Sequence, residues 1–405
     1  MKKILALVLC LILALAVLAC KGPEAPAAAP PVEKEPAAPA ANEPAVEEPA
    51  GPPANPNLAD FVKFTEPFEI NSYYNEKGVE CDVTYTATGG VVNVPNIPTT
   101  DMPKANSRYK IGFSVYYTVD EVGAMILDTM KQYAEICGVD LLVNDANYDQ
   151  NAQNQAIEQW IVEKVDGVIL APCDFYGVKE SLDALKAAGI PVITLNPALA
   201  GEANAVMMAE CVEQGAMAAQ LLIDHLLATG TPMKGKVVFQ TLPFVHPNAA
   251  TRKQGFVDAF KPYPDIEIIE LTGISPEDHY TAFEGALMSY GDELIGAFGL
   301  YSSATIGMLN AKKAANSPVP LTSIDNDKVI LEAIYNGELL GSCCYSSTAP
   351  AIWTMSQMVN LLNGAEIPAF MFMENTNVTK ANVEAMFELY YVGKTLADYM
   401  AGIVG

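Results

Sequence analysis

The stretch VDGVILAPCDFYGVKESLDALKAAGIPVITLN, residues 165–196, predicts one complete structural unit. Two apolar runs, DGVILAP and PVITLN, are typical of buried strands. The segment between them has helical character and ends at Gly189, a residue type that commonly terminates helices. A strand, a helix and a second strand in this order indicate parallel strands joined by a helical crossover.

The same alternation continues on both sides of this stretch. Further strand-like runs are KIGFSV, DLLVN, KVVFQTL, IEIIELT, LIGAFGL, LTSID and LLGSCCY. In residues 120–137 the apolar side chains recur on one helical face, at Val122, Met125, Ile126, Met130, Tyr133 and Cys137. About nine strand–helix units in this part of the chain fit two doubly wound lobes better than a single sheet. The predicted class is therefore α/β with two parallel-sheet lobes.

The N-terminus predicts export and a lipid anchor. Lys2 and Lys3 precede an apolar run, Ile4 to Leu18, that is short for a membrane span. The following VLAC resembles a bacterial lipobox, which implies cleavage before Cys20 and lipidation of its thiol. Residues 20–57 are rich in Pro, Ala and Glu and predict an extended tether. A secreted or uncleaved form is the alternative.

Charge and cysteine content narrow the possible partners. The 405-residue chain carries a formal net charge of −25, which argues against nucleic acid or an anionic membrane surface as a partner. Six cysteines follow Cys20, without a CxxC pattern, and free, mostly buried thiols are expected. Cys343 and Cys344 are adjacent in an apparent strand and should point to opposite faces.

Seven segments follow one another in a recognisable order: RYKIGFSVYYTVDEV, NDANYDQNAQNQAIEQWIVEKVDGVILAP, LKAAGIPVITLN, TRKQGFVDAF, LTSIDND, AIYNGELLGSCCY and VTKANV. Together they resemble type 1 periplasmic binding proteins of the ribose/galactose kind. The resemblance implies two lobes joined by a three-strand hinge, with a ligand between them. We expect these divisions: 1–19 signal peptide, 20–57 tether, 58–107 small β-rich extension, 108–203 plus 346–371 lobe one, and 204–345 plus 372–392 lobe two.

Candidate ligand-binding residues follow the predicted strands, because open parallel sheets bind ligands outside the carboxyl ends of their strands. Tyrosines can cover the C–H face of a sugar, whereas carboxylates, amides and Arg pair with hydroxyls. The alternatives are an amphipathic lid for each Tyr, a helix cap for Asp174 and Asp325, and an ion pair for Arg252. The candidates are Ser114, Tyr116, Tyr117, Asp174, Asn196, His246, Asn248, Arg252, Tyr301, Asp325 and Tyr345.

The resemblance supports some of these candidates and leaves others without precedent. HPNAATR resembles the galactose-type motif, which implies sugar contacts from His246, Asn248 and Arg252, and Asp325 matches a hydroxyl-binding carboxylate. The Asn-Pro-Phe-Phe of the family's first loop is replaced by residues 120–123, DEVG, so its stacking aromatics are missing. Tyr116 or Tyr117 is the candidate replacement.

Metal binding and catalysis have little support. The loop that begins at Asp145 alternates Asp and Asn like an EF-hand, but Gln150 and Ala156 stand where that motif needs Gly and Glu. The chain lacks GxSxG, HExxH, P-loop and GxGxxG motifs. His279, in the acidic segment PEDHY, is expected to face solvent. The sequence therefore predicts a binding protein without a metal or cofactor.

The leading hypothesis is a lipid-anchored solute-binding component of an ABC importer. Its expected partners are a sugar-like small molecule, ABC permease subunits and a lipid bilayer reached through acylated Cys20. We expect a monomer exported to the outer side of the membrane. The alternative is a sensor on the same fold that passes lobe closure to a receptor or sensor kinase.

Overall fold

The computed structural model describes residues 68–95, 102–118, 121–244, 246–391 and 394–402. The predictions for residues 1–57, including lipidation of Cys20, lie outside these ranges. The described residues belong to one compact unit, Gly51–Gly405. Among the helices of these ranges, none is long and apolar enough to cross a membrane.

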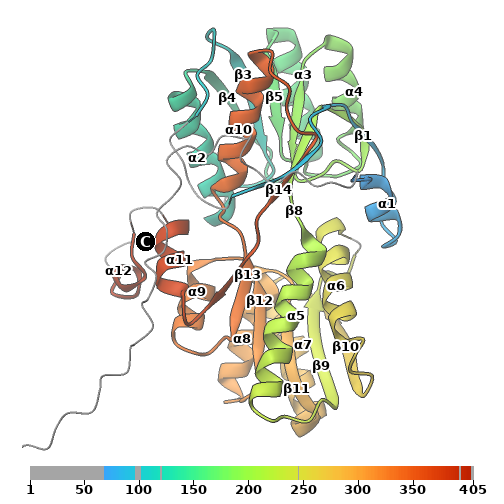
Figure 1. The fold of residues 1–405 in the computed structure, drawn as a ribbon, viewed down its shortest axis with the longest axis vertical. Helices are drawn as coiled ribbons and strands as arrows, with labels where there is room; N and C mark the ends of the chain where they lie inside the picture. The colour runs from blue at the N-terminus through green and yellow to red at the C-terminus, as the bar shows by residue number, and fades with distance from the viewer. Residues whose placement is uncertain (1–67, 96–101, 119–120, 245, 392–393, 403–405) are drawn as a thin grey trace, which may run out of the picture. The chain divides into compact units, whose positions relative to one another are not determined.

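Within the described ranges, the first sheet has seven parallel strands in the order β2-β14-β8-β6-β5-β3-β4 (Figure 1). Four helices cover it: α2 (Glu121–Cys137) and α10 (Ala349–Leu362) on one face, and α3 (Gln150–Glu163) and α4 (Lys179–Ala188) on the other. With both faces covered, the strands are mostly buried apolar runs. The strands are β2 (Val91–Val94), β3 (Lys110–Val115), β4 (Asp140–Asp145), β5 (Gly167–Leu170), β6 (Val192–Leu195), β8 (Ala205–Ala209) and β14 (Phe370–Met373).

In the same part of the chain, a second sheet has six strands in the order β10-β9-β11-β12-β13-β15. Only the pairing of β15 with β13 is antiparallel among these strands, a feature that the all-parallel prediction missed. The strands are β9 (Gly235–Thr241), β10 (Ile266–Thr272), β11 (Leu294–Gly299), β12 (Leu321–Ile324), β13 (Gly341–Cys344) and β15 (Thr376–Thr379). The predicted α/β class with two doubly wound sheets is confirmed.

Helices also cover both faces of the second sheet. On one face, α5 (Cys211–Ala228) and α6 (Pro247–Phe260) contribute residues to one hydrophobic core. On the other face, a second core contains residues of α7 (Pro276–Tyr290), α8 (Ser302–Ala314), α9 (Lys328–Tyr335) and α11 (Val383–Tyr390). The remaining elements are a 3-10 turn (Gly291–Glu293) and α12 (Leu396–Met400).

Three short described segments carry the chain between the sheets: those joining β8 to α5, β13 to α10, and β14 to β15. Ala205–Ala209 pairs in the first sheet, so the chain leaves that sheet after residue 209, beyond the boundary expected at 203. The division of the chain into two lobes at exact residues stays a prediction.

The segment before the regular alternation belongs to the first sheet in part. α1 (Ile70–Asn75) leads to β1 (Asp82–Tyr85), which pairs with β7 (Ala200–Ala203), and β2 then forms the edge of the seven-stranded sheet. The Tyr73 hydroxyl donates to Glu210 Oε1 at 2.6 Å, at the N-cap of α5. The segment thus contacts the start of the first connection between the sheets.

Two glycines allow α5 and α6 to lie unusually close together. A Cβ atom at Gly215 would lie 1.9 Å from the Arg252 carbonyl oxygen, and one at Gly255 would lie 1.9 Å from the Val212 carbonyl oxygen. Since any larger residue would collide with backbone at either position, the crossing requires glycine on both helices. This close crossing fixes the position of Arg252 along α5.

The cysteines match their prediction. The six described cysteines are free, and five of them are buried. Cys343 Sγ lies 3.7 Å from Met217 Sδ of α5, whereas Cys344 Sγ lies 3.6 Å from the Tyr390 hydroxyl of α11. The two adjacent thiols therefore do point to opposite faces of the second sheet.

Candidate functional site

Arg252 lies at the centre of a polar group of residues at the carboxyl end of the second sheet. It is 8% exposed, and its guanidinium donates through Nε to Gln214 Oε1 at 2.9 Å and through Nη1 to the Leu300 carbonyl at 3.1 Å. These two bonds orient the planar side chain and leave Nη2 directed at Asp325. The side chain is thus buried and held in one orientation by two hydrogen bonds.

Asp325 follows β12 in a left-handed backbone conformation, with φ of 81°. Its Oδ2 accepts hydrogen bonds from the Ser302 amide at 2.9 Å and the Ser302 hydroxyl at 3.2 Å. Its Oδ1 faces Arg252 Nη2 at 3.9 Å, which is longer than the roughly 2.7–2.9 Å of a charge-assisted hydrogen bond. The pair is close enough to attract but leaves a donor and an acceptor available.

Tyr345 and two buried amides lie near this pair. Burial raises the pKa of Tyr345, Arg252 lowers it and Asp325 raises it, so the three groups share one electrostatic environment. Gln214 Nε2 and Asn326 Nδ2 are buried and have no hydrogen-bond partner among the described residues. Buried N–H groups without partners are costly, which makes both amides candidates for a bound acceptor.

Asp327 is a second carboxylate that the sequence-based list of candidates omits. Its Oδ2 shares the single Ser302 hydroxyl proton with Asp325 Oδ2. Burial raises the pKa of Asp327 to about 6, and Asp325 and Glu121 contribute in the same direction. Its position two residues after Asp325 in the segment DND was the available signal.

His246 lies at the N-cap of α6 and meets a residue that follows a strand of the first sheet. Its imidazole makes an edge contact with Phe175, with ring centroids 5.1 Å apart and an interplanar angle of 88°. Burial, with a smaller contribution from Arg252, lowers the pKa of His246 to about 4. The ring is therefore neutral at pH 7 and can act as both donor and acceptor.

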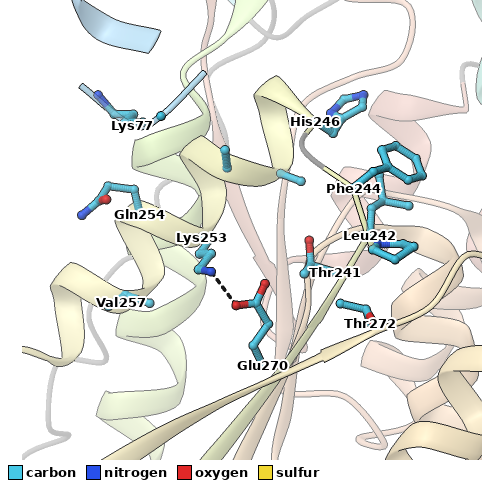
Figure 2. Close-up of a pocket in the computed structure, with 14 residues that line it drawn as sticks. Lys77, Thr241, Leu242, Phe244, His246, Lys253, Gln254, Val257, Glu270 and Thr272 are labelled. Carbon is cyan, nitrogen blue, oxygen red and sulfur yellow. Dashed lines mark hydrogen bonds and ion pairs between the residues drawn. The ribbon is translucent and has the colours of Figure 1, made fainter. Parts of the chain in front are cut away.

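A pocket of about 470 Å³ lies along the exposed side of α6, at the carboxyl ends of β9 and β10 (Figure 2). The ion pair between Lys253 and Glu270 lies within it, and Figure 2 shows Phe244 near His246, away from Lys77. Of the predicted ligand-binding residues, His246 lines this pocket, whereas Arg252 and Asp325 do not. The pocket is thus a neighbour of the Arg252 group.

Tyr116 and Tyr117, the candidate aromatics of the first sheet, both stack on a third tyrosine. The Tyr148 ring lies 5.6 Å from that of Tyr116 and 4.9 Å from that of Tyr117, with interplanar angles of 27° and 25°. Tyr148 follows β4, next to β3 in the sheet. The sequence contained this tyrosine in NDANYDQ, but nothing in its spacing indicated the stack.

Three other candidates use their polar groups within their own lobes. The Ser114 hydroxyl, buried in β3, donates to Asn144 Oδ1 at 3.0 Å and accepts from Gln153 Nε2 at 2.9 Å. Asp174 Oδ1 accepts the backbone amides of Tyr176 and Gly177 in the turn before α4, and since the N-cap of that helix is Val178, the helix-cap alternative for Asp174 is wrong. The Tyr301 hydroxyl lies 2.6 Å from His279 Nε2, part of a buried network described next.

The prediction for His279 is wrong, because this residue is fully buried. Its Nδ1 lies 2.8 Å from Gln240 Oε1, and burial lowers its pKa. Asp278 of PEDHY does not point into the core with the imidazole. Asp278 instead completes a capping box with Ser275 at the start of α7. A histidine on the inner face of an amphipathic helix cannot be recognised from acidic neighbours alone.

Asn196 and Asn248 are the remaining candidates. Asn196 follows β6 with φ of 71°, and its backbone N–H donates to the Met207 carbonyl at 2.9 Å. Asn248 lies in the first turn of α6 and is partly buried. Within the described ranges, no group of three or more His, Cys, Asp or Glu side chains is placed to hold a metal ion.

Comparisons with known proteins agree on one family. Residues 111–366 match the model of the periplasmic binding protein domain. The chain is 24% identical to a xylitol-binding protein of Mycolicibacterium smegmatis over 296 residues, covering 70% of this chain and 81% of that protein. It is 24% identical to a ribose import binding protein of Bacillus subtilis over 237 residues, covering 57% and 74%.

Solved structures share the fold. A solute-binding protein of an ABC transporter from Mycobacterium smegmatis, with bound glycerol, has a TM-score of 0.63 at 24% identity, covering 69% of this chain and 96% of that one. An arabinose-binding protein from Shewanella, bound to arabinofuranose, has a TM-score of 0.63 at 20% identity, covering 73% and 97%. At these identities the structures establish the fold alone.

Proposed function

The chain belongs to the periplasmic binding protein family, among solute-binding proteins of ABC transporters for sugars and polyols, and we propose that it is the lipid-anchored receptor of such an importer. The proposed ligand is a neutral sugar or sugar-like polyol held between the two lobes. Binding, not catalysis, is the activity, as in the named relatives.

The gap between Arg252 and Asp325 is the observation that carries this proposal. A hydroxyl oxygen roughly 2.8 Å from both partners fits between Nη2 and Oδ1, which lie 3.9 Å apart. It would accept from the guanidinium and donate to the carboxylate at the same time, a pairing that a hydroxyl can make and a carboxylate or ammonium ligand cannot. A sugar hydroxyl is therefore the group that this geometry suits best.

The surrounding groups favour a ligand with several hydroxyls. Gln214 Nε2 and Asn326 Nδ2 supply buried donors, and the neutral imidazole of His246 supplies either role. Arg252 and Asp325 carry opposite charges, so an ionic ligand would gain little attraction from this pair. Tyr116 and Tyr117 from the first sheet offer an apolar surface for ring C–H groups.

Contacts between residues of the two lobes can couple ligand binding to closure of the lobes. His246 contacts Phe175, and Glu121 of α2 pairs with Lys328 of α9. A ligand that touches both lobes binds the closed form more tightly and shifts the population towards it. The permease subunits of the importer would then recognise that closed form.

The anchor and the tether rest on the sequence. Lipidation of Cys20 would hold the protein at the outer side of the membrane, with residues 21–57 as a spacer. The sensor alternative shares the binding step and differs only in the protein that recognises closure. Replacing Cys20 with Ser should abolish incorporation of labelled fatty acid into the protein, whereas equal labelling of the variant would contradict lipidation of Cys20.

The ligand class is tested by identifying what the purified protein carries. Protein isolated from its own host is denatured, and the small molecules released are identified by mass spectrometry. We expect a neutral polyhydroxylated compound in stoichiometric amount. A charged compound such as an amino acid, bound in stoichiometric amount and displaced by no sugar, would contradict the proposal.

A further inference from the structure

Tyr148 combines two features that a structural residue rarely has together. It is 60% exposed, although it is a large aromatic side chain, and its backbone is left-handed, with φ of 59°. Its predecessor Asn147 is also left-handed, with φ of 48°. Asn tolerates this conformation, but a tyrosine there is strained, and Gly would serve an ordinary turn better.

Hydrogen bonds on both sides of Tyr148 hold the loop in this strained form. The Tyr148 amide donates to the Tyr116 carbonyl at 2.7 Å, and the Asn147 amide donates to Asp145 Oδ1 at 3.1 Å. Asp149 then begins α3 by accepting the amides of Asn151 and Ala152. Strain that neighbouring bonds maintain is typical of functional positions.

The loop holds the Tyr148 ring nearly parallel to two others. Tyr116 and Tyr117 follow β3, Tyr148 follows β4, and the strands are paired up to Val115 and Asp145. The three rings therefore form one aromatic platform at the carboxyl edge of the first sheet, the edge where parallel sheets bind ligands. Tyr148 is largely exposed, so the platform is accessible from solvent at this edge.

We infer that Tyr148 is a ligand-binding residue that sets specificity for the C–H face of a sugar or polyol. The inference rests on the proposed function and adds a residue from the loop after β4. Residues 120–123, DEVG, contain no aromatic residue to stack on a ligand, and the tyrosine platform supplies one from the adjacent strands. An aromatic face selects ligands that expose several C–H groups on one side and rejects charged, compact ones.

Calorimetric titration with ribose, L-arabinose, xylitol and myo-inositol tests this assignment. Tyr148→Ala should weaken binding of whichever probe the wild type binds by about tenfold or more, whereas Tyr148→Phe, which keeps the ring, should stay within about threefold. Tyr335→Ala is the matched control, because Tyr335 is an exposed tyrosine at the end of α9, and it should leave affinity unchanged.

The outcomes separate this inference from the proposed function. Wild-type binding that Tyr148→Ala leaves unchanged overturns the role of Tyr148 while the function stands. Failure of the wild type to bind any neutral sugar or polyol overturns the proposed function, and the role of Tyr148 with it. A loss of affinity in Tyr148→Ala that Tyr148→Phe shares equally would show that the hydroxyl matters, and would contradict stacking as the cause.

Discussion

Asp325 offers the sharpest test at the scale of a single residue. Asp325→Asn keeps the size of the side chain and tolerates the left-handed backbone, but it can place an NH₂ donor where Oδ1 now faces Arg252. The variant should therefore bind the ligand at least about tenfold more weakly, roughly 1.4 kcal/mol, with little change in melting temperature. Titration calorimetry measures the first and thermal unfolding of the empty protein the second.

Arg252 itself is a poorer choice for mutation, because the structure shows that it is buried and bonded on two sides. Removing it would leave the Gln214 amide oxygen and the Leu300 carbonyl without their donor, at a cost of about 1–3 kcal/mol in stability. A loss of binding in Arg252→Ala would then mix two effects. Unchanged affinity in Asp325→Asn would contradict the proposed hydroxyl site without this ambiguity.

His246 predicts a pH dependence with a definite sign. Its pKa is about 4 in the folded protein and about 6.5 in an unfolded chain. Between these values the unfolded chain binds a proton that the folded protein excludes, so the free energy of unfolding falls as pH decreases through this window. His246→Gln should remove about 1–2 kcal/mol of the stability lost between pH 7 and pH 5.

Denaturant unfolding of the wild type and of His246→Gln at both pH values measures this difference. Equal losses for the two proteins would show that the imidazole is exposed enough to titrate normally. The wild-type protein alone is not sufficient, because Asp327 changes stability in the opposite sense: its raised pKa favours the folded state as pH falls through about 6.

The sequence predicted the positions of some site residues but not the contacts of others. The strand-end argument identified Arg252, Asp325 and Tyr345, which do lie together, because strand ends in a parallel sheet share one edge. It could not show that the Ser114 hydroxyl is used inside the sheet, or that His279 turns inward, since both depend on contacts with distant residues. Tyr148 also follows a strand, β4, so the strand-end argument could have named it, whereas the stacking of its ring on Tyr116 and Tyr117 had no signal in the sequence.

At the scale of elements, the crossing of α5 and α6 predicts a strong effect from a small substitution. Gly255→Ala places a methyl group against the Val212 carbonyl and should destabilise the protein by about 1–3 kcal/mol while weakening ligand binding, because Arg252 moves with α6. Thermal unfolding and titration calorimetry on the same variant measure both effects.

Gly285→Ala is the matched control for that crossing. Gly285 lies within α7, and nothing stands within 4 Å of a Cβ atom added there. The substitution should stabilise the protein by about 0.5–1 kcal/mol, since glycine is unfavourable inside a helix. A Gly255→Ala protein as stable as Gly285→Ala would mean that the two helices are not in the close contact described.

The ion pair between α2 and α9 predicts a change in affinity without a contact to the ligand. Glu121 pairs with Lys328, whose side chain is 13% exposed and whose Nζ lies 5.0 Å from the centre of the Tyr391 ring. The Tyr391 hydroxyl also donates to Glu121 Oε2 at 3.2 Å. Glu121→Gln removes one charge from this partly buried pair and should weaken ligand binding about fivefold, roughly 1 kcal/mol.

Asp140→Asn is the control for the ion pair. Asp140 pairs with Arg108, both residues belong to the lobe of the first sheet, and both side chains are well exposed. It should leave affinity unchanged. Equal affinities for Glu121→Gln and Asp140→Asn would contradict a role for the Glu121 pair in closure. The sequence identified residues 120–123 as a departure from the family motif but gave no partner for Glu121, which lies about 200 positions from Lys328.

At the scale of the whole molecule, the fold was predictable and the edges of the sheets were not. Repeated strand–helix alternation constrains a chain to parallel sheets covered by helices, and segments such as residues 165–196 show it without any relative. The positions of the antiparallel strand β15 and the edge strand β2 depend instead on which sheet the chain joins after each connection. Short runs of four residues carry too little periodicity to reveal such returns.

Thermal unfolding of the purified protein against a panel of neutral sugars and polyols tests the central claim most directly. Binding to the folded state alone stabilises it by about 2.7 kcal/mol when the ligand is at a hundred times its dissociation constant. We predict that at least one pentose, hexose or polyol raises the melting temperature by several degrees, and that Asp325→Asn abolishes the rise. A panel without any stabilising member, or an equal rise in Asp325→Asn, would contradict the account.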